Sequence, residues 1–345
     1  MRVSMYYSNH DIRVEEKPIP SIGAGELLVK VESSGICGSD VMEWYRKYKV
    51  PLVLGHEMAG EIAEIGTGVN GFSKGDRIVA SHHVPCGTCH YCTQGHPTVC
   101  NTLRQTNFIP GAFSEYLKLT SVHVQQGVLK IPDTVSYDEA TFVEPLACVL
   151  RGQKIARMNK GKTVLILGSG ISGLLHVSAA RALGAEHVIA TDVIEYRLNA
   201  ARRFGATEIV SAADDVPERI KKCNKGRLAD IVIVCAAPLS VYEQALQSVD
   251  RGGTILVFSA AQEGSSLPVP INDVFWRNEI TITSSYAGSP ADCAEALKWI
   301  VNKKINVSQM ITHRFPLDET NKGFELVSKG KESIKVIIKP HVKSS

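Results

Sequence analysis

The sequence predicts an α/β protein of two domains, a small β-barrel and a doubly wound parallel sheet. The chain has 345 residues, which is too long for one ordinary hydrophobic core. Residues 1 to about 150 contain short strand-like runs separated by glycine turns. From about residue 152, buried strands alternate with helices, which is the pattern of a doubly wound sheet.

Strand and turn signals dominate the first region. Residues 27–31 have the composition of a strand, and residues 61–65 alternate polar and apolar side chains with the period of a half-buried strand. Glycine turns at 66–68 and 74–76 separate such runs. Many short strands between turns are typical of a small barrel.

Regular strand–helix alternation marks the second region. Residues 163–167 form a continuous apolar run, and the helix expected after it ends at Gly184. Near residue 286 the alternation gives way to a final helix and further strands. The expected elements are strands at 163–167, 187–190, 231–234, 254–257 and 334–338, and helices at 174–183, 197–204 and 291–301.

Composition and charge argue against several classes of protein. Hydrophobic residues make up 44% of the chain and charged residues 21%, and a net charge of +3 without a basic stripe argues against nucleic-acid binding. The N-terminus lacks the apolar core of a signal peptide, and the most apolar stretch, 163–177, is too short to span a bilayer. Nine cysteines suit a reducing compartment. We therefore expect a cytoplasmic protein that binds neither nucleic acid nor membrane.

The most specific feature is a cluster of four cysteines within fifteen residues: Cys86, Cys89, Cys92 and Cys100. Four thiolates this close match the tetrahedral coordination of zinc, and such a site has no position left for a substrate. We therefore expect a structural zinc. Two disulfides are an alternative that a reducing compartment disfavours. His90 or His96 could replace one sulfur, which the surplus of thiols makes unnecessary.

A glycine-rich loop follows the strand at 163–167 and precedes a helix. Glycines there allow a tight turn and close approach of backbone N–H groups to a pyrophosphate, and the helix N-terminus adds positive potential. The residues expected to contact a dinucleotide in this way are Gly168, Gly170, Ile171 and Gly173.

Asp192 closes the next strand. A carboxylate there can accept hydrogen bonds from the adenosine ribose hydroxyls and repels a 2′-phosphate, so it favours NAD over NADP. Capping of the following helix is the alternative role of Asp192. Arg197 could balance an NADP phosphate, but its place after Asp192 favours a position beside the adenine or in solvent.

The cysteine spacing resembles the structural zinc lobe of the medium-chain, zinc-dependent alcohol and polyol dehydrogenases, and the other motifs extend this resemblance along the chain. It implies a GroES-like catalytic domain from residues 1–151 and 286–345, with the zinc lobe at about 86–100. Residues 152–285 would form a Rossmann cofactor domain, with the active cleft between the domains. The family also forms homodimers and homotetramers.

A second, catalytic zinc is implied by the same resemblance. Cys37, His56 and Glu144 stand in motifs that resemble the ligands of the sorbitol and L-threonine dehydrogenase branch. Three protein ligands leave the fourth position open for water or substrate. Glu144 also lies in an apolar run, where a bare carboxylate is costly without a cation or a donor.

Two other residues could supply the third ligand of the catalytic zinc in place of Glu144. Cys148 lies four residues after Glu144 and would share its face if Pro145 opens a helix. Glu57 is adjacent to His56, and some relatives use that position at the metal. A zinc ion with one thiolate, a neutral imidazole and one carboxylate is neutral, which favours Glu144 and leaves Glu57 as a neighbour or a transient ligand.

Ser39, Asp40 and Met42 follow Cys37 closely, and the resemblance gives each a role in the reaction or in the support of the metal. Ser39 occupies the position of the hydroxyl that takes the alcohol proton in the family, and Asp40 resembles the carboxylate that orients the imidazole of His56. Capping of a helix over 41–48 is the alternative role of Ser39. Where many relatives carry a histidine that passes the proton onward, this chain has Met42, which cannot relay a proton.

These features predict a reversible oxidoreductase with two zinc ions per subunit that transfers a hydride from a secondary alcohol to NAD. The substrate would be a small polyol, sugar acid or amino alcohol. Residues 44–49 contain three cations and three aromatic residues, which suit an anionic or polyhydroxylated substrate or simply a solvated loop. The alternatives are a zinc-free NADPH quinone reductase and a non-catalytic nucleotide-binding regulator.

Overall fold

The computed structural model describes residues 1–343, and the chain divides into two compact units. Unit 1 contains Met1–Ala147 and Ala287–Ser345, and unit 2 contains Cys148–Tyr286. The boundaries expected from the sequence lie within four residues of these. Helix α6 (Val143–Ile155) runs across the first of the two boundaries.

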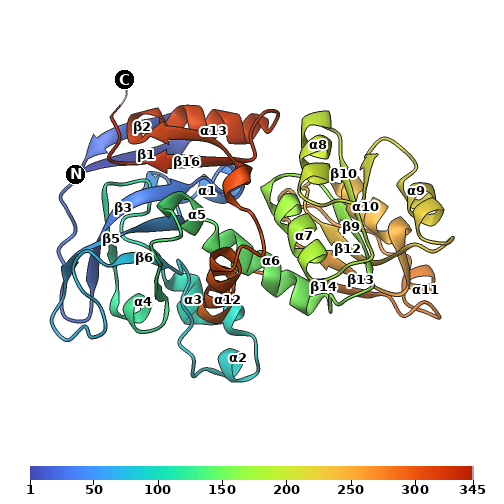
Figure 1. Cartoon of the computed structure of the whole chain (residues 1–345), viewed down its shortest axis with the longest axis horizontal. Coiled ribbons are helices and arrows are strands. Elements are labelled where there is room, and N and C mark those ends of the chain that lie inside the picture. Colours follow the sequence, from blue (N-terminus) through green and yellow to red (C-terminus); the bar gives the residue numbers. More distant parts are fainter. Residues whose placement is uncertain (344–345) are drawn as a thin grey trace. The chain divides into compact units, whose positions relative to one another are not determined.

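Unit 1 is built mainly of antiparallel strands in two sheets (Figure 1). The larger sheet is β15 (Ile311–Pro316), β16 (Lys335–Lys339), β3 (Leu27–Gly35), β5 (Glu57–Ile65), β6 (Arg77–Ala80) and β8 (Val128–Lys130), with β7 (Tyr116–Leu119) also paired to β3. The smaller sheet is β2 (Asp11–Glu16), β1 (Arg2–Ser8) and β4 (Leu52–Val53). Only β15 and β16 pair in parallel within these sheets.

Short helices connect these strands. They are α1 (Glu43–Arg46), α2 (His90–Thr93), α3 (Asn101–Gln105), α4 (Ser121–Gln126), α5 (Tyr137–Ala140), α12 (Pro290–Val301) and α13 (Thr320–Lys329), with 3-10 turns η1 (Pro97–Val99), η2 (Ser308–Met310) and η3 (Leu317–Glu319). The helix expected over 291–301 is therefore confirmed as α12, which begins with a capping box at Ser289. The helix expected over 41–48 is shorter than predicted.

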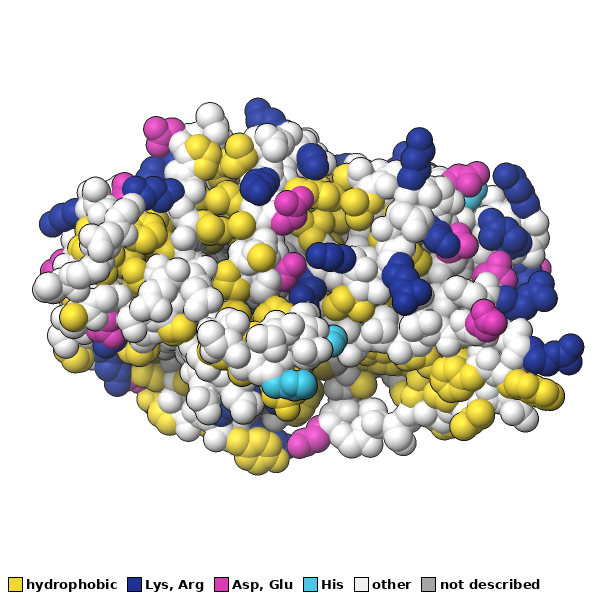
Figure 2. Space-filling view, turned by 90° about the horizontal axis from the view of Figure 1, so that it is seen from below, with side chains coloured by type: hydrophobic (Ala, Val, Ile, Leu, Met, Phe, Trp, Pro, Cys, Tyr) yellow, Lys and Arg dark blue, Asp and Glu magenta, His cyan; other side chains and the backbone are white. Residues whose placement is uncertain are grey.

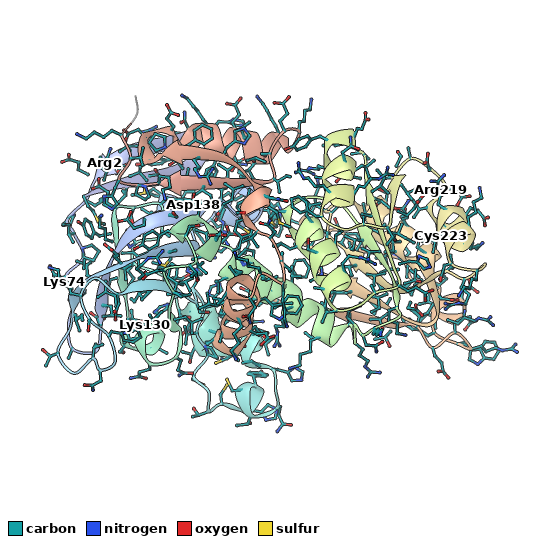
Figure 3. All side chains as sticks on the ribbon, viewed as in Figure 1. Arg2, Lys74, Lys130, Asp138, Arg219 and Cys223 are labelled. Atoms are coloured by element: carbon teal, nitrogen blue, oxygen red, sulfur yellow. The ribbon has the colours of Figure 1, made fainter. Side chains whose placement is uncertain are left out.

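The C-terminal segment returns to the N-terminal part of unit 1, as the resemblance implied. Strand β16 pairs with β3, so the red and blue ends of the chain lie side by side in Figure 1. Asp138 of α5, labelled in Figure 3, fixes this junction because its carboxylate accepts from Ser33 Oγ at 2.6 Å, Arg314 Nε at 2.7 Å and Lys339 Nζ at 2.9 Å.

Unit 2 is a parallel sheet of six strands in the order β11-β10-β9-β12-β13-β14. This order is that of a doubly wound dinucleotide-binding sheet, with its switch point between β9 and β12. The strands are β9 (Thr163–Leu167), β10 (His187–Asp192), β11 (Glu208–Ser211), β12 (Ala229–Val234), β13 (Val249–Val257) and β14 (Thr281–Ser284). The helices are α7 (Ile171–Ala182), α8 (Glu195–Arg203), α9 (Val216–Cys223), α10 (Leu239–Ser248) and α11 (Ile271–Val274).

Buried aliphatic side chains of β9, β10 and β12 form the core of unit 2, and Leu165, Ile189 and Val232 among them have no exposed surface. Unit 1 has separate clusters around Phe113 and Phe324 and around Val29 and Ile62. Among residues 1–343, no helix is both long and apolar enough to cross a bilayer. On the face shown in Figure 2, basic, acidic and hydrophobic side chains are mixed, without a continuous basic stripe.

Candidate metal centres and dinucleotide site

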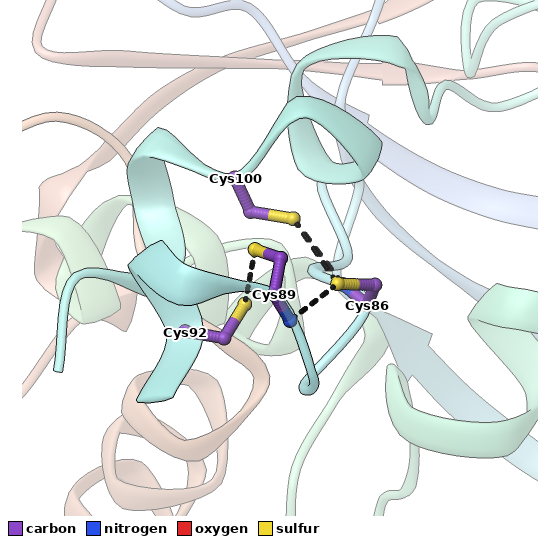
Figure 4. A group of neighbouring side chains, drawn as sticks. All are labelled: Cys86, Cys89, Cys92 and Cys100. Carbon is purple, nitrogen blue, oxygen red and sulfur yellow. Dashed lines mark hydrogen bonds between the residues drawn. The ribbon is translucent and has the colours of Figure 1, made fainter. Parts of the chain in front are cut away.

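The four clustered cysteines point toward one another (Figure 4). The Sγ atoms of Cys89 and Cys92 lie 3.6 Å apart, as do those of Cys86 and Cys100. Sulfurs bound at about 2.3 Å to one zinc would lie about 3.8 Å apart, whereas a disulfide needs about 2.05 Å. All nine cysteines are free thiols, so the structure contains neither of the alternative disulfides. The group of close ligand atoms contains the four sulfurs and neither His90 nor His96.

Backbone N–H groups donate to the sulfurs of this lobe and favour their thiolate form. The N–H of Cys89 donates to Cys86 Sγ at 3.3 Å, and the N–H of Cys86 donates to Cys100 Sγ at 3.4 Å. Hydrogen bonds from the amides of Thr88 and Cys89 lower the pKa of the Cys86 thiol to about 5. A thiolate that is already stabilised by N–H donors is the species that binds zinc.

A second group of ligand atoms belongs to Cys37, His56 and Glu57, and these atoms lie within 4.8 Å of one another. Strand pairing explains why they meet. Cys37 follows the end of β3, His56 precedes the start of β5, and the antiparallel register places Gly35 opposite Glu57. Gly35 must be glycine here, because a Cβ would lie 2.2 Å from Glu57 Oε2.

Asp40 fixes the geometry of two of these groups. Its Oδ2 accepts from the N–H of Cys37 at 3.0 Å, and its Oδ1 lies 3.4 Å from His56 Nδ1. Burial opposes the positive form of His56, but the charges of Asp40 and Cys37 outweigh burial and hold the pKa of His56 well above its usual range. With Nδ1 turned to a carboxylate, Nε2 is the nitrogen that remains for a metal, as in carboxylate–histidine–zinc arrangements.

Glu57 has a cationic partner that the sequence did not reveal. Lys335 of β16 places its Nζ 2.5 Å from Glu57 Oε2, and both side chains are almost completely buried. The same ammonium lies 3.4 Å from the carbonyl of Ile36 and 5.6 Å from the centre of the Phe142 ring. The available signal was a lysine in an otherwise apolar strand, since a buried ammonium needs a counterion.

Ser39 lies next to Cys37 and is held by Arg46. Its N–H points to Cys37 Sγ at 3.5 Å, and Arg46 Nε donates to its carbonyl at 3.2 Å. Helix α1 begins only at Glu43 with Met42 as its N-cap, and no side chain caps it. The capping role considered for Ser39 is therefore wrong, because the chain between Cys37 and Met42 forms turns and leaves Ser39 outside the helix.

Two further histidines border this site, and sequence reasoning missed them. The ring of His82 lies 5.7 Å from that of His56 and 4.4 Å from that of His83. Burial holds the pKa of His82 well below its usual range and lowers that of His83 to about 4, so both rings are neutral near pH 7. The signal was the His-His pair just before the first cysteine of the lobe.

Glu144 lies in the first turn of α6, and Cys148 lies one turn further along the same helix. Glu144 does not belong to the close group formed by Cys37, His56 and Glu57. Its charge acts on Cys293, whose thiol pKa is raised to about 12, mainly by burial and further by Glu144. Cys293 also interacts with Ser81, the residue before His82. The carboxylate of Glu144 therefore acts on Cys293 and does not belong to the close group of Cys37, His56 and Glu57.

The glycine-rich loop of unit 2 has the expected conformation between β9 and α7. Gly168 has a positive φ of 99°, Gly170 is the N-cap of α7, and Ile171 is its first residue. A Cβ at Gly173 would lie 1.9 Å from the carbonyl oxygen of Gly168, so only glycine allows this close packing. Such a turn brings backbone N–H groups and a helix N-terminus to one place, which suits a pyrophosphate.

Asp192 is 6% exposed and braces this loop. Its Oδ2 accepts from Ser169 N and its Oδ1 accepts from Ile194 N, each at 2.9 Å. Helix α8 has Ile194 as its N-cap without a side-chain cap, so the capping alternative for Asp192 is wrong. Arg197 Nη1 lies 3.8 Å from Asp192 Oδ2. Each carboxylate oxygen keeps a second lone pair that a ribose hydroxyl could use.

Comparison with known proteins decides the family. Residues 23–133 match the family described as "Alcohol dehydrogenase GroES-like domain", and residues 172–302 match the one described as "Zinc-binding dehydrogenase". The chain is 31% identical to sorbitol dehydrogenase of Bacillus subtilis (strain 168), over 99% of this chain and 98% of that one. The chain belongs to the zinc-dependent medium-chain alcohol and polyol dehydrogenases.

Two further relatives of this dehydrogenase family are similar along nearly the whole chain. L-threonine 3-dehydrogenase of Idiomarina loihiensis is 32% identical, over 92% of this chain and 93% of that one. A candidate zinc-binding dehydrogenase of Sinorhizobium meliloti 1021, solved with NADP bound, is 30% identical with a TM-score of 0.87, and the match covers 98% of this chain and 99% of that one.

Family membership confirms the predicted fold class, a GroES-like domain with a Rossmann domain, and the predicted class of reaction. The chain is a zinc-dependent oxidoreductase that acts on a CH–OH group. Its donor atoms fit the metal, because the lobe offers four sulfurs and the second group offers sulfur, imidazole nitrogen and carboxylate oxygen. A lobe that bound one zinc ion through all four sulfurs would have no position for a substrate, so the mixed group is the one suited to chemistry.

Proposed function

We propose that this dehydrogenase oxidises a secondary hydroxyl of a polyol, sugar acid or amino alcohol with NAD, reversibly. The observation that carries the proposal is the meeting of Cys37, His56 and Ser39 beside Asp40, together with a dinucleotide loop braced by Asp192. The first cluster suits a polarised hydroxyl, and the loop suits the hydride acceptor.

Two zinc ions per subunit are part of this proposal. The lobe would hold one, and Cys37, His56 and Glu144 would hold the other. Glu57 is the alternative third ligand, because its oxygen lies in the close group. Its ion pair with Lys335 supports the choice of Glu144, since a carboxylate already neutralised by an ammonium gains less from a metal.

Bound zinc would supply acidity by polarising the oxygen of the alcohol. The chain's own residues have the remaining tasks. Asp40 orients the imidazole of His56 and the amide of Cys37. Ser39 would accept the proton of the alcohol on its Oγ. Met42 cannot pass that proton onward, so ordered water or the ribose hydroxyls of the cofactor would carry it.

The preference for NAD is proposed from Asp192. Its buried carboxylate beside the glycine-rich loop would meet a 2′-phosphate with like charge, which disfavours NADP. Arg197 lies close enough to soften that repulsion, and the similar Sinorhizobium meliloti protein was solved with NADP. Comparing kcat/KM for the two cofactors tests the preference, and Asp192→Ala should improve the use of NADP relative to NAD. A parent enzyme that prefers NADP contradicts this part.

The reaction itself is tested with a panel of polyols, sugar acids and L-threonine, by following the absorbance of NADH. Metal analysis of the same preparation should find about two zinc ions per subunit, one removed by mild chelation and one retained. Glu144→Ala should lose the exchangeable ion and Cys148→Ala should retain it. The reverse pattern would give the third ligand position to Cys148.

Assembly and compartment complete the proposal. The nine free thiols support a reducing cytoplasm. We expect a homodimer or homotetramer, as in the wider family, without nucleic acid or membrane as a partner. Light scattering after size-exclusion chromatography would measure the mass directly, and a monomer under assay conditions would contradict this expectation.

A further inference from the structure

Arg46 occupies an unusual position for the last residue of a four-residue helix. Its side chain is only 13% exposed, although Tyr45, Lys47, Tyr48 and Lys49 around it are exposed. The guanidinium turns inward, where Nε donates to the carbonyl of Ser39 at 3.2 Å and Nη2 lies 3.5 Å from Ser39 Oγ. A cation therefore lies directly beside the hydroxyl that is proposed to take the substrate proton.

The charge of Arg46 is only partly matched by protein groups. Its nearest carboxylate is Asp40, whose Oδ1 is 3.5 Å from Nη2 and also 3.4 Å from His56 Nδ1. The other oxygen of Asp40 already accepts from the N–H of Cys37. Among residues 1–343, no group accepts a hydrogen bond from Nη1. A guanidinium has five N–H donors in a planar fork, so this one keeps donors for an external acceptor.

The surroundings of Arg46 add further cationic or neutral groups. Burial chiefly lowers the pKa of His83, and the nearby charge of Arg46 lowers it further, so its field reaches the histidines beside His56. Glu57 is neutralised by its buried ion pair with Lys335. Lys49 Nζ lies 4.7 Å from the centre of the Tyr45 ring, and Arg46 Cζ lies 4.9 Å from the same centre. Glu43 is the one acidic side chain in the segment 43–49.

We infer that Arg46 recognises an anionic group of the substrate, so that the preferred secondary alcohol carries a carboxylate or a phosphate close to the reacting hydroxyl. This inference rests on the proposed function and narrows its substrate class. Planar, charge-assisted hydrogen bonds from arginine are the ordinary means of holding either oxyanion. The same guanidinium would contact both Ser39 and the anionic group of the substrate. This double contact would fix the position of the reacting carbon relative to the anionic end.

The test compares a hexitol with the corresponding hexonate and hexitol phosphate, using the zinc-loaded enzyme and NAD. The parent enzyme should show the highest kcat/KM for one of the two anions. The better of the two shows whether the anionic group of the preferred substrate is a carboxylate or a phosphate. Arg46→Gln should lower kcat/KM for that anion about 10- to 100-fold more than for the hexitol, mostly through KM. Arg46→Lys should retain part of the preference because it keeps the charge without the fork.

Lys49→Gln is the matched control, because it removes a charge from the same segment without any contact to Ser39 or Asp40. It should change the ratio of anion to hexitol by less than about twofold, within ordinary surface effects. An equal loss for all three substrates in Arg46→Gln would show that Arg46 only braces Ser39 and would overturn the inference. So would a parent enzyme that prefers the hexitol.

A binding measurement separates this inference from the proposed function. If the parent enzyme oxidises none of the three compounds, the proposed function fails for this class. Calorimetry with the NAD-loaded protein then still tests Arg46. Binding of the hexonate or the phosphate that is lost in Arg46→Gln and kept in Lys49→Gln supports anion recognition. Failure of the parent protein to bind either anion refutes it.

Discussion

The cysteine lobe and the Cys37–His56 site would hold their proposed metals by different means. The lobe takes four identical ligands from fifteen neighbouring residues, and its supports are backbone N–H groups within the same segment. The second site would take unlike ligands from the ends of two strands, Cys37 and His56, and from helix α6, Glu144, and the charged side chains of Asp40 and Lys335 lie beside it. A site with four protein ligands leaves no coordination position for a substrate. A site with three protein ligands keeps its fourth coordination position open, and the charged groups around it can adjust the properties of the metal.

A pair of serine substitutions tests the difference between the two sites most directly. Cys37→Ser should lower turnover by more than about a thousandfold in a protein that stays folded, because it removes a ligand of the reactive metal. Cys86→Ser should instead lower the melting temperature or prevent assembly, because structural zinc contributes folding free energy. Steady-state kinetics and thermal unfolding measure the two effects. If the two variants exchange phenotypes, the assignment of the sites is reversed.

Removal of the ammonium beside Glu57 should have the next largest effect. Lys335→Met leaves a buried carboxylate without its partner, which costs about 3–5 kcal/mol in comparable buried pairs. Urea unfolding would measure the loss. The double variant Lys335→Met with Glu57→Gln removes both charges and should recover much of it. A single variant as stable as the parent would mean that Glu57 finds another cation, for which the reactive zinc is the nearest choice.

Asp40→Asn should affect only the second site. Loss of the carboxylate that faces His56 should lower zinc affinity there about 10- to 100-fold, as for other carboxylates behind a histidine ligand. It should also lower the pKa of His56 in the metal-free protein, because Asp40 is one of the two groups, with Cys37, that raise that pKa against the effect of burial. Chelator competition and NMR titration measure the two quantities. Equal weakening of the lobe would contradict the separation of the two sites.

The smallest expected effect concerns the proton path at Met42. Met42→His would add a group that titrates near neutrality next to Ser39, so it should raise the oxidation rate a few-fold or shift its pH profile. A solvent isotope effect on the parent enzyme first shows whether proton transfer limits turnover. If it does, and the variant changes neither rate nor profile, position 42 does not face the proton path.

Sequence reasoning found the parts of the site that are governed by local spacing. Local motifs predicted three features: the lobe, the glycine-rich loop and Asp192 at the end of a strand. Each lies within one short segment whose spacing of cysteines, glycines or acidic residues is visible in the sequence. Cys37 and His56 were recognised from motifs, and the pairing of β3 with β5 explains their meeting. Lys335 could not be assigned, because its partner Glu57 is 278 residues away in the chain. Contacts of that range depend on which strands pair, and periodicity does not encode the choice of neighbour.

The inward turn of Arg46 could not be predicted from the sequence for a related reason. A run of cations and aromatics is compatible with a solvated loop, and only the short helix α1 shows which cation turns in. The same holds for Glu144. Its apolar surroundings predicted a partner, but the distance from Glu144 to the other ligands depends on how α6 packs.

The contact between Glu57 and Lys335 implies an order in which the two sites are completed during synthesis of the chain. Ribosomes release the chain from its N-terminus, and segments fold as they emerge. All four lobe cysteines have been synthesised by residue 100, so a nascent chain can capture zinc there early. The second cluster waits until β16 emerges and brings the ammonium that neutralises Glu57. A product truncated before β16 could thus carry the first metal while Glu57, beside the second site, lacks its counterion.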